Sequence, residues 1–252
     1  MHLYNAMKYI KNPNLPQSRV DTVVISETAH EAIRSLKKLN IKTFLIPSDK
    51  RLPAPVSSHA DLQLLHLGGN KLFVQNEHLC RGELKEKFEI SGISVNPGNK
   101  YPEDVKLNCA IIGDKIICNK CTVAHEILEF AEIHNLTVIN VNQGYTKCSV
   151  CVINEKSIIT DDKSIFTATQ NFFDDVLLIS KNSILLKGYN YGFIGGCCGK
   201  IDKDKLAING AIESHTDHNE IIDFLDRNHI ECIELTKDRL TDIGGILPLI
   251  EV

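Results

Sequence analysis

The stretch Ala124-His125-Glu126-Ile127-Leu128 recurs earlier in the chain as Ala29-His30-Glu31-Ala32-Ile33, and the two lie 95 residues apart. Asn40 and Asn135, which follow the two stretches, are separated by the same 95 residues. Each His-Glu pair opens a run with apolar residues near helical spacing, so we expect a helix that ends at the asparagine and a strand after it. A constant offset over helix and strand indicates an internal repeat.

A third copy begins at Asn219-Glu220-Ile221-Ile222 and ends at Asn228-His229, with Glu220 lying 94 residues after Glu126. Pairs of short apolar runs with turn residues between them also recur, which is typical of hairpins. These expected hairpins span residues 61–74, 105–118, 148–160 and 198–209. Because an offset of 94 or 95 covers two units, the chain is expected to hold five units of about 47 residues each.

The fifth apolar run, residues 242–250, contains only one strand, and its expected partner is the strand at residues 22–26. That pairing predicts an α/β fold of five ββαβ units closed into a propeller. A closed ring removes sheet edges that five small sheets would otherwise expose. We expect one domain over residues 21–252, after an N-terminal arm at residues 1–20. The alternative is an ordinary α/β domain whose internal similarity is coincidental.

The composition is that of a globular protein, with 252 residues, 43% hydrophobic and 24% charged. The net charge of −4 is dispersed, so nucleic acid is not an expected partner. Residues 1–19 lack the apolar core of a signal peptide, and no apolar run approaches the ~20 residues that cross a bilayer, so we expect a soluble cytoplasmic protein without a membrane partner. The oligomeric state stays open. Nine cysteines in a reducing compartment indicate thiols, metal ligands or nucleophiles rather than disulfides.

Two short stretches carry candidate chemistry. In Gly144-Tyr145-Thr146-Lys147-Cys148-Ser149-Val150-Cys151-Val152-Ile153-Asn154, a turn leads into a strand with Cys148 at its mouth. A thiol there is placed to act as a nucleophile if its pKa is lowered, or else it fills a buried strand position. In His59-Ala60-Asp61, the carboxylate could orient the imidazole for proton transfer. The alternative for His59 is a surface histidine in a polar loop.

Five ββαβ units closed into a propeller resemble the pentein fold of arginine deiminases, dimethylarginine dimethylaminohydrolases and amidinotransferases. His59-Ala60-Asp61 resembles the His-x-Asp of the deiminases, whose histidine is the general acid/base. Residues 146–154 resemble the nucleophile strand of the dimethylaminohydrolases. His59 falls in the first unit and Cys148 in the third, and these enzymes also place the two residues two units apart. The resemblance implies that Cys148 attacks, His59 moves protons, and Asp61 orients His59 or binds substrate.

The chain also departs from these enzymes, which carry their cysteine after a glycine pair near the C-terminus. Here Gly244-Gly245 is followed by Ile246. In those enzymes, acidic residues hold the guanidinium of the substrate. When the units of this chain are matched to theirs, the corresponding positions fall near Cys197 and Ile246, and neither residue can neutralise that cation. We therefore expect a separate pentein-like family that does not act on free arginine. The expected substrate contacts are Cys197, Asn142 and Asp242.

The favoured function is a hydrolase or transferase that acts on a carbon–nitrogen bond of a small molecule through a covalent intermediate on Cys148. An imidazolium from His59 would lower the pKa of Cys148, which predicts rapid alkylation well below pH ~8. No cofactor is expected. The alternatives are a non-catalytic binding module and a metal or redox site formed at the axis by Cys148, Cys197 and His59.

A joint metal site formed by Cys118-x-x-Cys121 and Cys148-x-x-Cys151 is not expected. The 26 residues between the two pairs exceed the roughly 15–20 of common zinc ribbons. Cys148 and Cys151 would also point to opposite faces of one strand.

Overall fold

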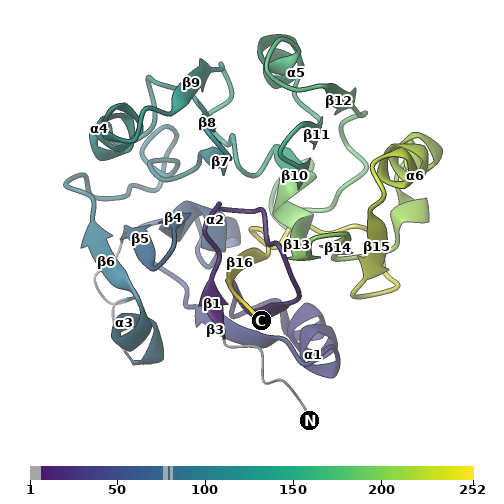
Figure 1. The fold of residues 1–252 in the computed structure, drawn as a ribbon, viewed down its shortest axis with the longest axis horizontal. Coiled ribbons are helices and arrows are strands. Elements are labelled where there is room, and N and C mark those ends of the chain that lie inside the picture. The colour runs from purple at the N-terminus through teal and green to yellow at the C-terminus, as the bar shows by residue number, and fades with distance from the viewer. Residues whose placement is uncertain (1–6, 76–78, 80–81) are drawn as a thin grey trace.

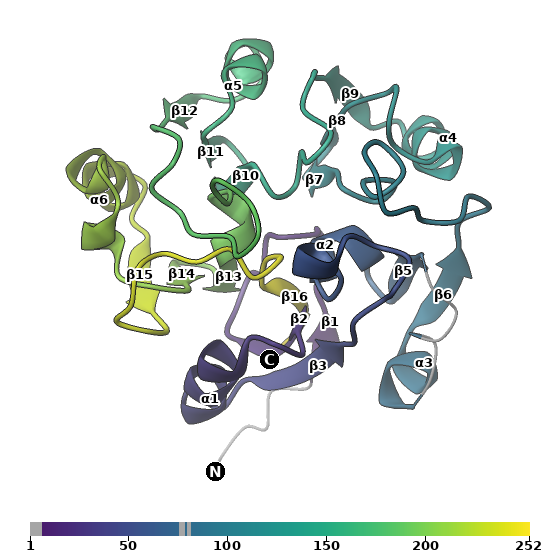
Figure 2. The same ribbon diagram turned by 180° about the vertical axis from the view of Figure 1, so that it is seen from behind.

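Five small sheets are arranged around a common centre in the computed structural model, which describes residues 7–75, 79 and 82–252 (Figure 1). Four sheets combine one antiparallel and one parallel pair of strands, and the fifth, four-stranded sheet adds a second antiparallel pair. The view from behind shows the same arrangement, with the short helix α2 (Ala60–Gln63) near the centre and the other labelled helices toward the outside (Figure 2). The fold is therefore a mixed α/β fold built from one repeated unit.

The strands of the sheets are short. They are β1 (Lys8–Tyr9), β2 (Val20–Ser26), β3 (Lys42–Ile46), β4 (Leu64–Gly68), β5 (Lys71–Val74), β6 (Glu89–Gly92), β7 (Ala110–Ile112), β8 (Lys115–Cys118), β9 (Thr137–Asn140), β10 (Val150–Asn154), β11 (Ser157–Thr160), β12 (Asp175–Leu178), β13 (Cys198–Asp202), β14 (Lys205–Ile208), β15 (Glu231–Glu234) and β16 (Leu247–Glu251). The α-helices are α1 (His30–Lys38), α2 (Ala60–Gln63), α3 (Glu83–Lys87), α4 (His125–Ile133), α5 (Lys163–Thr169) and α6 (His218–Arg227). None of these described helices has the length and apolar character that crossing a bilayer requires.

The sequence repeat corresponds to a repeated way of ending a helix. Asn40 follows α1 with φ 58°, and Asn135 follows α4 with φ 53°. In the third copy the left-handed residue is His229, after α6, with φ 56°. Asparagine tolerates this conformation, which is common just past a helix C-terminus. The predicted helix ends are confirmed in all three copies, and in the third the left-handed residue is the second of the predicted pair Asn228-His229.

The last strand of the chain completes the sheet that the first strands begin. β16 runs antiparallel to β2, with Leu247 opposite Val24, so the predicted pairing is confirmed. β1 pairs with the other edge of β16, where Tyr9 lies opposite Ile250. Part of the segment expected to be an arm is thus a fourth strand of this sheet.

The hairpin predicted over residues 61–74 begins later than expected. Ala60–Gln63 form the short helix α2, and strand pairing starts where Leu64 meets Val74. The backbone N–H of Asp61 donates to the carbonyl of Gly244 at 3.1 Å, so it bonds to a neighbouring unit and not to a hairpin partner. The segment before the strand is thereby turned toward residues from the end of the chain.

Buried apolar residues form several clusters instead of one continuous core. Five of these clusters each combine residues from two neighbouring sheets, which ties every sheet to the next. They contain Val24 with Leu64, Leu65 with Ile111, Ile112 with Val152, Ile153 with Leu206, and Ile201 with Val23.

Candidate active site

Cys148 lies in the turn before β10 and is held by two polar residues of other units. Its backbone N–H donates to Asn108 Oδ1 at 3.2 Å, and the neighbouring N–H of Lys147 donates to the same oxygen at 2.7 Å. The thiol donates to Asp61 Oδ2 at 3.0 Å and accepts from Asn108 Nδ2 at 3.1 Å. Cys148 is only 2% exposed. The sulfur is therefore fixed in position.

This environment favours the protonated thiol. Burial raises the pKa of Cys148 well above its ordinary value, and the negative charges of Asp61 and Asp242 raise it further. The hydrogen bond from Asn108 acts in the opposite direction but is the smaller effect. The expectation of a lowered pKa for Cys148 is thus wrong in this structure, because burial and then the charges of Asp61 and Asp242 raise it.

His59 immediately precedes α2, and its buried ring faces a carboxylate. The His59 Nδ1 atom lies 3.7 Å from Asp242 Oδ1, close enough for an ion pair but long for a hydrogen bond. Asp61, which was expected to orient this ring or to bind substrate, accepts a hydrogen bond from the thiol of Cys148. The carboxylate beside the imidazole is Asp242.

The turn at Gly244-Gly245 places Asp242 against His59. Gly244 has φ +75°, and a Cβ atom on it would lie 2.4 Å from the Cβ atom of His59. Glycine avoids that collision and tolerates the left-handed backbone. The Asp242 carboxylate accepts from the backbone N–H groups of Gly244 and Phe193, each at 3.0 Å. Burial nevertheless raises the pKa of Asp242, while the neighbouring His59 lowers it.

Cys148, His59 and Asp242 line one cavity of about 190 Å³. They come from three different sheet units, and Asp61 and Asn108 support the thiol from outside the lining. The cavity thus contains a thiol, an imidazole and a carboxylate. This set can supply a nucleophile, a proton carrier and a negative charge for a cation.

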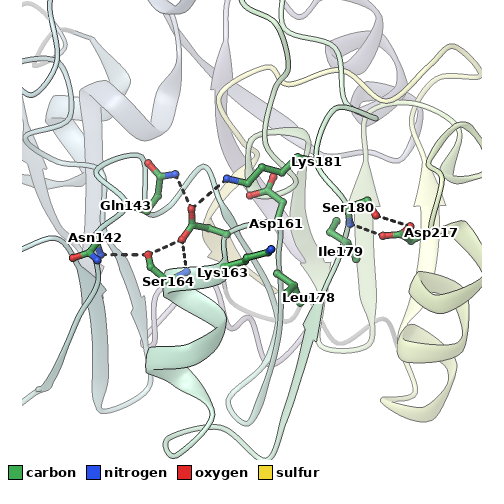
Figure 3. Close-up of a pocket in the computed structure, with 11 residues that line it drawn as sticks. Asn142, Gln143, Asp161, Lys163, Ser164, Leu178, Ile179, Ser180, Lys181 and Asp217 are labelled. Atoms are coloured by element: carbon green, nitrogen blue, oxygen red, sulfur yellow. Dashed lines mark hydrogen bonds and ion pairs between the residues drawn. The ribbon is translucent and has the colours of Figure 1, made fainter.

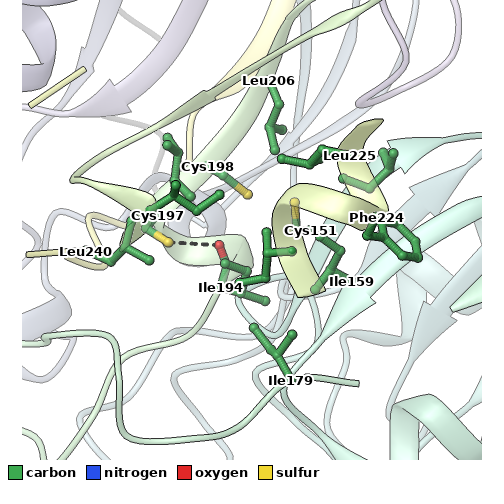
Figure 4. Packing of buried hydrophobic residues seen from close by; sticks show 14 of the residues in the cluster. Cys151, Ile159, Ile179, Ile194, Cys197, Cys198, Leu206, Phe224, Leu225 and Leu240 are labelled. Carbon is green, nitrogen blue, oxygen red and sulfur yellow. Dashed lines mark hydrogen bonds between the residues drawn. The ribbon is translucent and has the colours of Figure 1, made fainter. Parts of the chain in front are cut away.

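Cys197, a predicted substrate contact, lies elsewhere. It is fully buried, and its thiol donates to the carbonyl of Ile194 at 3.1 Å within an apolar cluster (Figure 4). The short 3-10 turn Gly195–Cys197 turns this side chain away from the cavity. Burial raises the pKa of Cys197, as expected for a thiol packed in a core.

Asn142, another predicted contact, lines a second cavity of about 760 Å³ together with Asp161 and Lys163 (Figure 3). Its backbone N–H donates to Ser164 Oγ at 3.3 Å. Of the predicted residues, the structure therefore gathers Cys148, His59, Asp61 and Asp242, and it leaves Cys197 and Asn142 outside.

Asn108 was missed from the sequence, although a positional signal existed. It stands two residues before β7, as Cys148 stands two residues before β10. The segments that precede the first strand of each unit turn toward the centre, so the matching position in every unit was a candidate.

The cysteine pairs do not assemble into a shared site. Cys118 is buried at the end of β8 and Cys121 is exposed. Cys148 belongs to the turn and not to the strand that holds Cys151. Within the described part of the chain, no group of three or more histidine, cysteine, aspartate or glutamate side chains has a metal-binding arrangement.

The model of a family of unknown function (DUF6873) matches residues 23–247. The chain belongs to this family. No curated protein matches the sequence.

Solved structures share the fold at low sequence identity. An inosamine-phosphate amidinotransferase from Streptomyces griseus is 9% identical with a TM-score of 0.59, over 96% of this chain and 97% of its own. A DDAH from Pseudomonas aeruginosa complexed with citrulline is 12% identical with a TM-score of 0.55, over 90% and 96%. An agmatine deiminase from C. jejuni is 11% identical with a TM-score of 0.54, over 93% and 92%. These proteins are penteins, so the resemblance to that superfamily is confirmed in the fold.

Proposed function

We propose that this protein is a cysteine-dependent hydrolase or transferase that acts on a carbon–nitrogen bond of a small amidine-type molecule. The observation that carries the proposal is that Cys148, His59 and Asp242 line one cavity, with Asp61 bonded to the thiol. The amidinotransferase and deiminase names of the structural neighbours agree with this type of reaction. Free arginine is not the proposed substrate.

We further infer that the five sheets close into a propeller. Two features support closure, namely the β16–β2 pairing and the apolar clusters between each pair of neighbouring sheets. Closure matters for the site because Cys148, His59 and Asp242 belong to different units. Their relative positions depend on the packing of every unit in the ring.

The charges around the thiol favour a cationic substrate. Burial and the carboxylates of Asp61 and Asp242 oppose a negative charge on the sulfur of Cys148, so the thiol favours its protonated form. An amidinium in the cavity compensates those charges, which lowers the pKa of Cys148 and favours the thiolate. The thiolate would thus form when a substrate is present.

The proposed reaction has two stages. His59 accepts the thiol proton of Cys148, Sγ attacks the central amidine carbon, the carbon–nitrogen bond breaks, and the departing amine takes that proton from His59. A water then attacks the S-bound carbon, with His59 accepting its proton, and the carbon–sulfur bond breaks to leave a carbonyl product and the free thiol. In a transferase, a second amine takes the place of water.

Covalent labelling tests this proposal. The two reagents are 2-chloroacetamidine, which is cationic, and 2-chloroacetamide, which is neutral and nearly the same shape. Peptide mass spectrometry at neutral pH should show that Cys148 prefers the cationic reagent about ten-fold more than exposed Cys121 does. Cys121 in the same molecule corrects for the intrinsic difference between the reagents.

A His59→Ala variant should label more slowly with the cationic reagent while retaining its thermal unfolding temperature. If Cys148 and Cys121 show the same preference, the nucleophile assignment fails, and a non-catalytic binding module becomes the better description.

A further inference from the structure

The cavity beside Cys148 has a wall of aromatic side chains. The wall consists of Tyr145, which lies in the turn before Cys148, and of three residues from the segment 189–193, namely Tyr189, Tyr191 and Phe193. The remaining apolar lining is aliphatic and comes from Val56, Leu62 and Leu186. This is more aromatic surface than holding a small amidine group alone would need.

Packing holds the aromatic rings in place. Tyr145 and Phe193 are stacked, with centroids 5.9 Å apart and planes at 25°. Tyr191 meets Phe193 edge-on, with centroids 5.7 Å apart. The hydroxyl of Tyr145 donates to the carboxylate of Asp104, and Tyr101 packs against the Tyr145 ring at 6.1 Å. A ring fixed in this way can present its face to a ligand without losing freedom on binding.

Two glycines allow the wall to approach the site. A Cβ atom on Gly144 would lie 2.5 Å from the Tyr101 ring, and a Cβ atom on Gly192 would lie 2.6 Å from Asp242 Cβ. Both contacts are shorter than side chains allow. The aromatic segments therefore depend on the absence of side chains at these two positions.

The charge in the cavity has one sign. Asp242 lines it and Asp61 lies directly behind the thiol, whereas the described lining contains no lysine or arginine. The nearby Lys181 ammonium is 5.9 Å from the centroid of the Tyr191 ring and pairs with Asp162 at 3.4 Å. A ligand carboxylate inside the cavity would meet no lysine or arginine, and the imidazole of His59 already faces Asp242, so its desolvation would be poorly compensated.

We propose that the substrate is an amidine or guanidine whose substituent is an uncharged alkyl or aryl group, with no carboxylate. The amidinium charge is attracted by Asp242, Asp61 and the faces of the aromatic rings, and the substituent packs against the rings. A cavity of about 150 Å³ holds a benzene ring in other proteins, so about 190 Å³ leaves room for a small substituted ring. This inference rests on the proposed function, because it concerns the same cavity.

Calorimetric titration of a Cys148→Ser variant with benzamidine tests the inference without any covalent step. Benzamidine should bind, whereas neutral benzamide and free arginine should each bind at least about ten-fold more weakly. Phe193→Ala in the same background should weaken benzamidine about ten-fold, and Phe193→Leu should weaken it less. Phe172→Ala is the matched control, because Phe172 is exposed and lies outside the cavity.

The possible outcomes separate this inference from the proposed function. If benzamidine binds with the expected selectivity but Cys148 shows no preference for 2-chloroacetamidine, the catalytic proposal fails. The inference that the cavity binds amidines with an uncharged substituent is then retained. If benzamidine does not bind, or if arginine binds as tightly, the inference is overturned. Equal affinity of the folded Phe193→Ala, Phe193→Leu and parent proteins would also overturn it.

Discussion

The thiol of Cys148 donates its hydrogen bond to a carboxylate, an arrangement opposite to that of a permanently activated cysteine. Asp61 accepts from this thiol, and Asp242 faces the nearby imidazole of His59. Both carboxylates are buried, so their effect on neighbouring groups is weakly screened. The reactivity of Cys148 is therefore expected to depend on what occupies the cavity.

Asp61→Asn should speed the labelling of Cys148 by neutral 2-chloroacetamide and reduce its preference for cationic 2-chloroacetamidine. Loss of the negative charge removes one cause of the raised pKa of Cys148, so 2-chloroacetamide should react several-fold faster at a given pH, roughly as expected for a modest pKa decrease. The amidine reagent should lose its advantage because one attracting charge is gone. Asp114→Asn, an exposed substitution, is the control. An unchanged rate with 2-chloroacetamide would contradict the assigned cause.

The sequence predicted some of the residues of the site and missed others. Cys148 and His59 were predicted through the family resemblance, because their motifs are short and contiguous. Asn108 was not predicted, because a single asparagine has no signature apart from its place in the repeat. Cys197 was expected near the axis, but a local turn directs its sulfur to a backbone carbonyl.

Among the structural elements, the short segments that precede strands determine the site. α2 carries Asp61 just after His59, the turn before β10 carries Cys148, and the turn at Gly244 carries Asp242 to the imidazole. The repeated apolar runs predicted these strands well, since the hairpin expected over residues 148–160 contains both β10 and β11. They did not predict α2, because that helix depends on a hydrogen bond to a unit distant in sequence.

Gly244→Ala should lower the free energy of unfolding more than Gly69→Ala, although both glycines have a positive φ. Gly69 also has a positive φ, +60°, but a Cβ atom there would meet open space. Both variants carry the left-handed strain of about 1–2 kcal/mol. Gly244→Ala adds overpacking against His59, which we expect to cost about 1–3 kcal/mol more. Urea unfolding measures the difference, and equal losses in the two variants would show that the close approach is unimportant.

In the whole molecule, the sheet formed by β16 and β2 joins the two ends of the chain (Figure 1). The repeat offsets and the unpaired last strand were sufficient to predict this pairing. They could not predict β1, since a two-residue strand has no periodicity and its pairing with β16 depends on the tertiary fold.

Leu249→Ala tests how much this sheet contributes to the stability of the whole fold. Leu249 belongs to β16 and is fully buried in the apolar cluster that β16 forms with the neighbouring unit. Its truncation should destabilise the protein by about 2–5 kcal/mol. Leu45→Ala, on β3 of the same sheet but 50% exposed, should cost much less, on the order of 0.5 kcal/mol. Chemical denaturation should show one cooperative transition in both variants. Similar small losses would mean that the last strand is peripheral to the fold.

We propose that a cation in the cavity converts a protonated Cys148 into a thiolate. The pH dependence of 2-chloroacetamide labelling at Cys148 should be measured alone, with a small amidinium salt that leaves room for the reagent, and with saturating benzamidine. The small amidinium should lower the apparent pKa of Cys148, and benzamidine should protect Cys148 from the reagent. An apparent pKa unaffected by the amidinium, in a protein that benzamidine does not protect, would show that a cation does not activate the thiol.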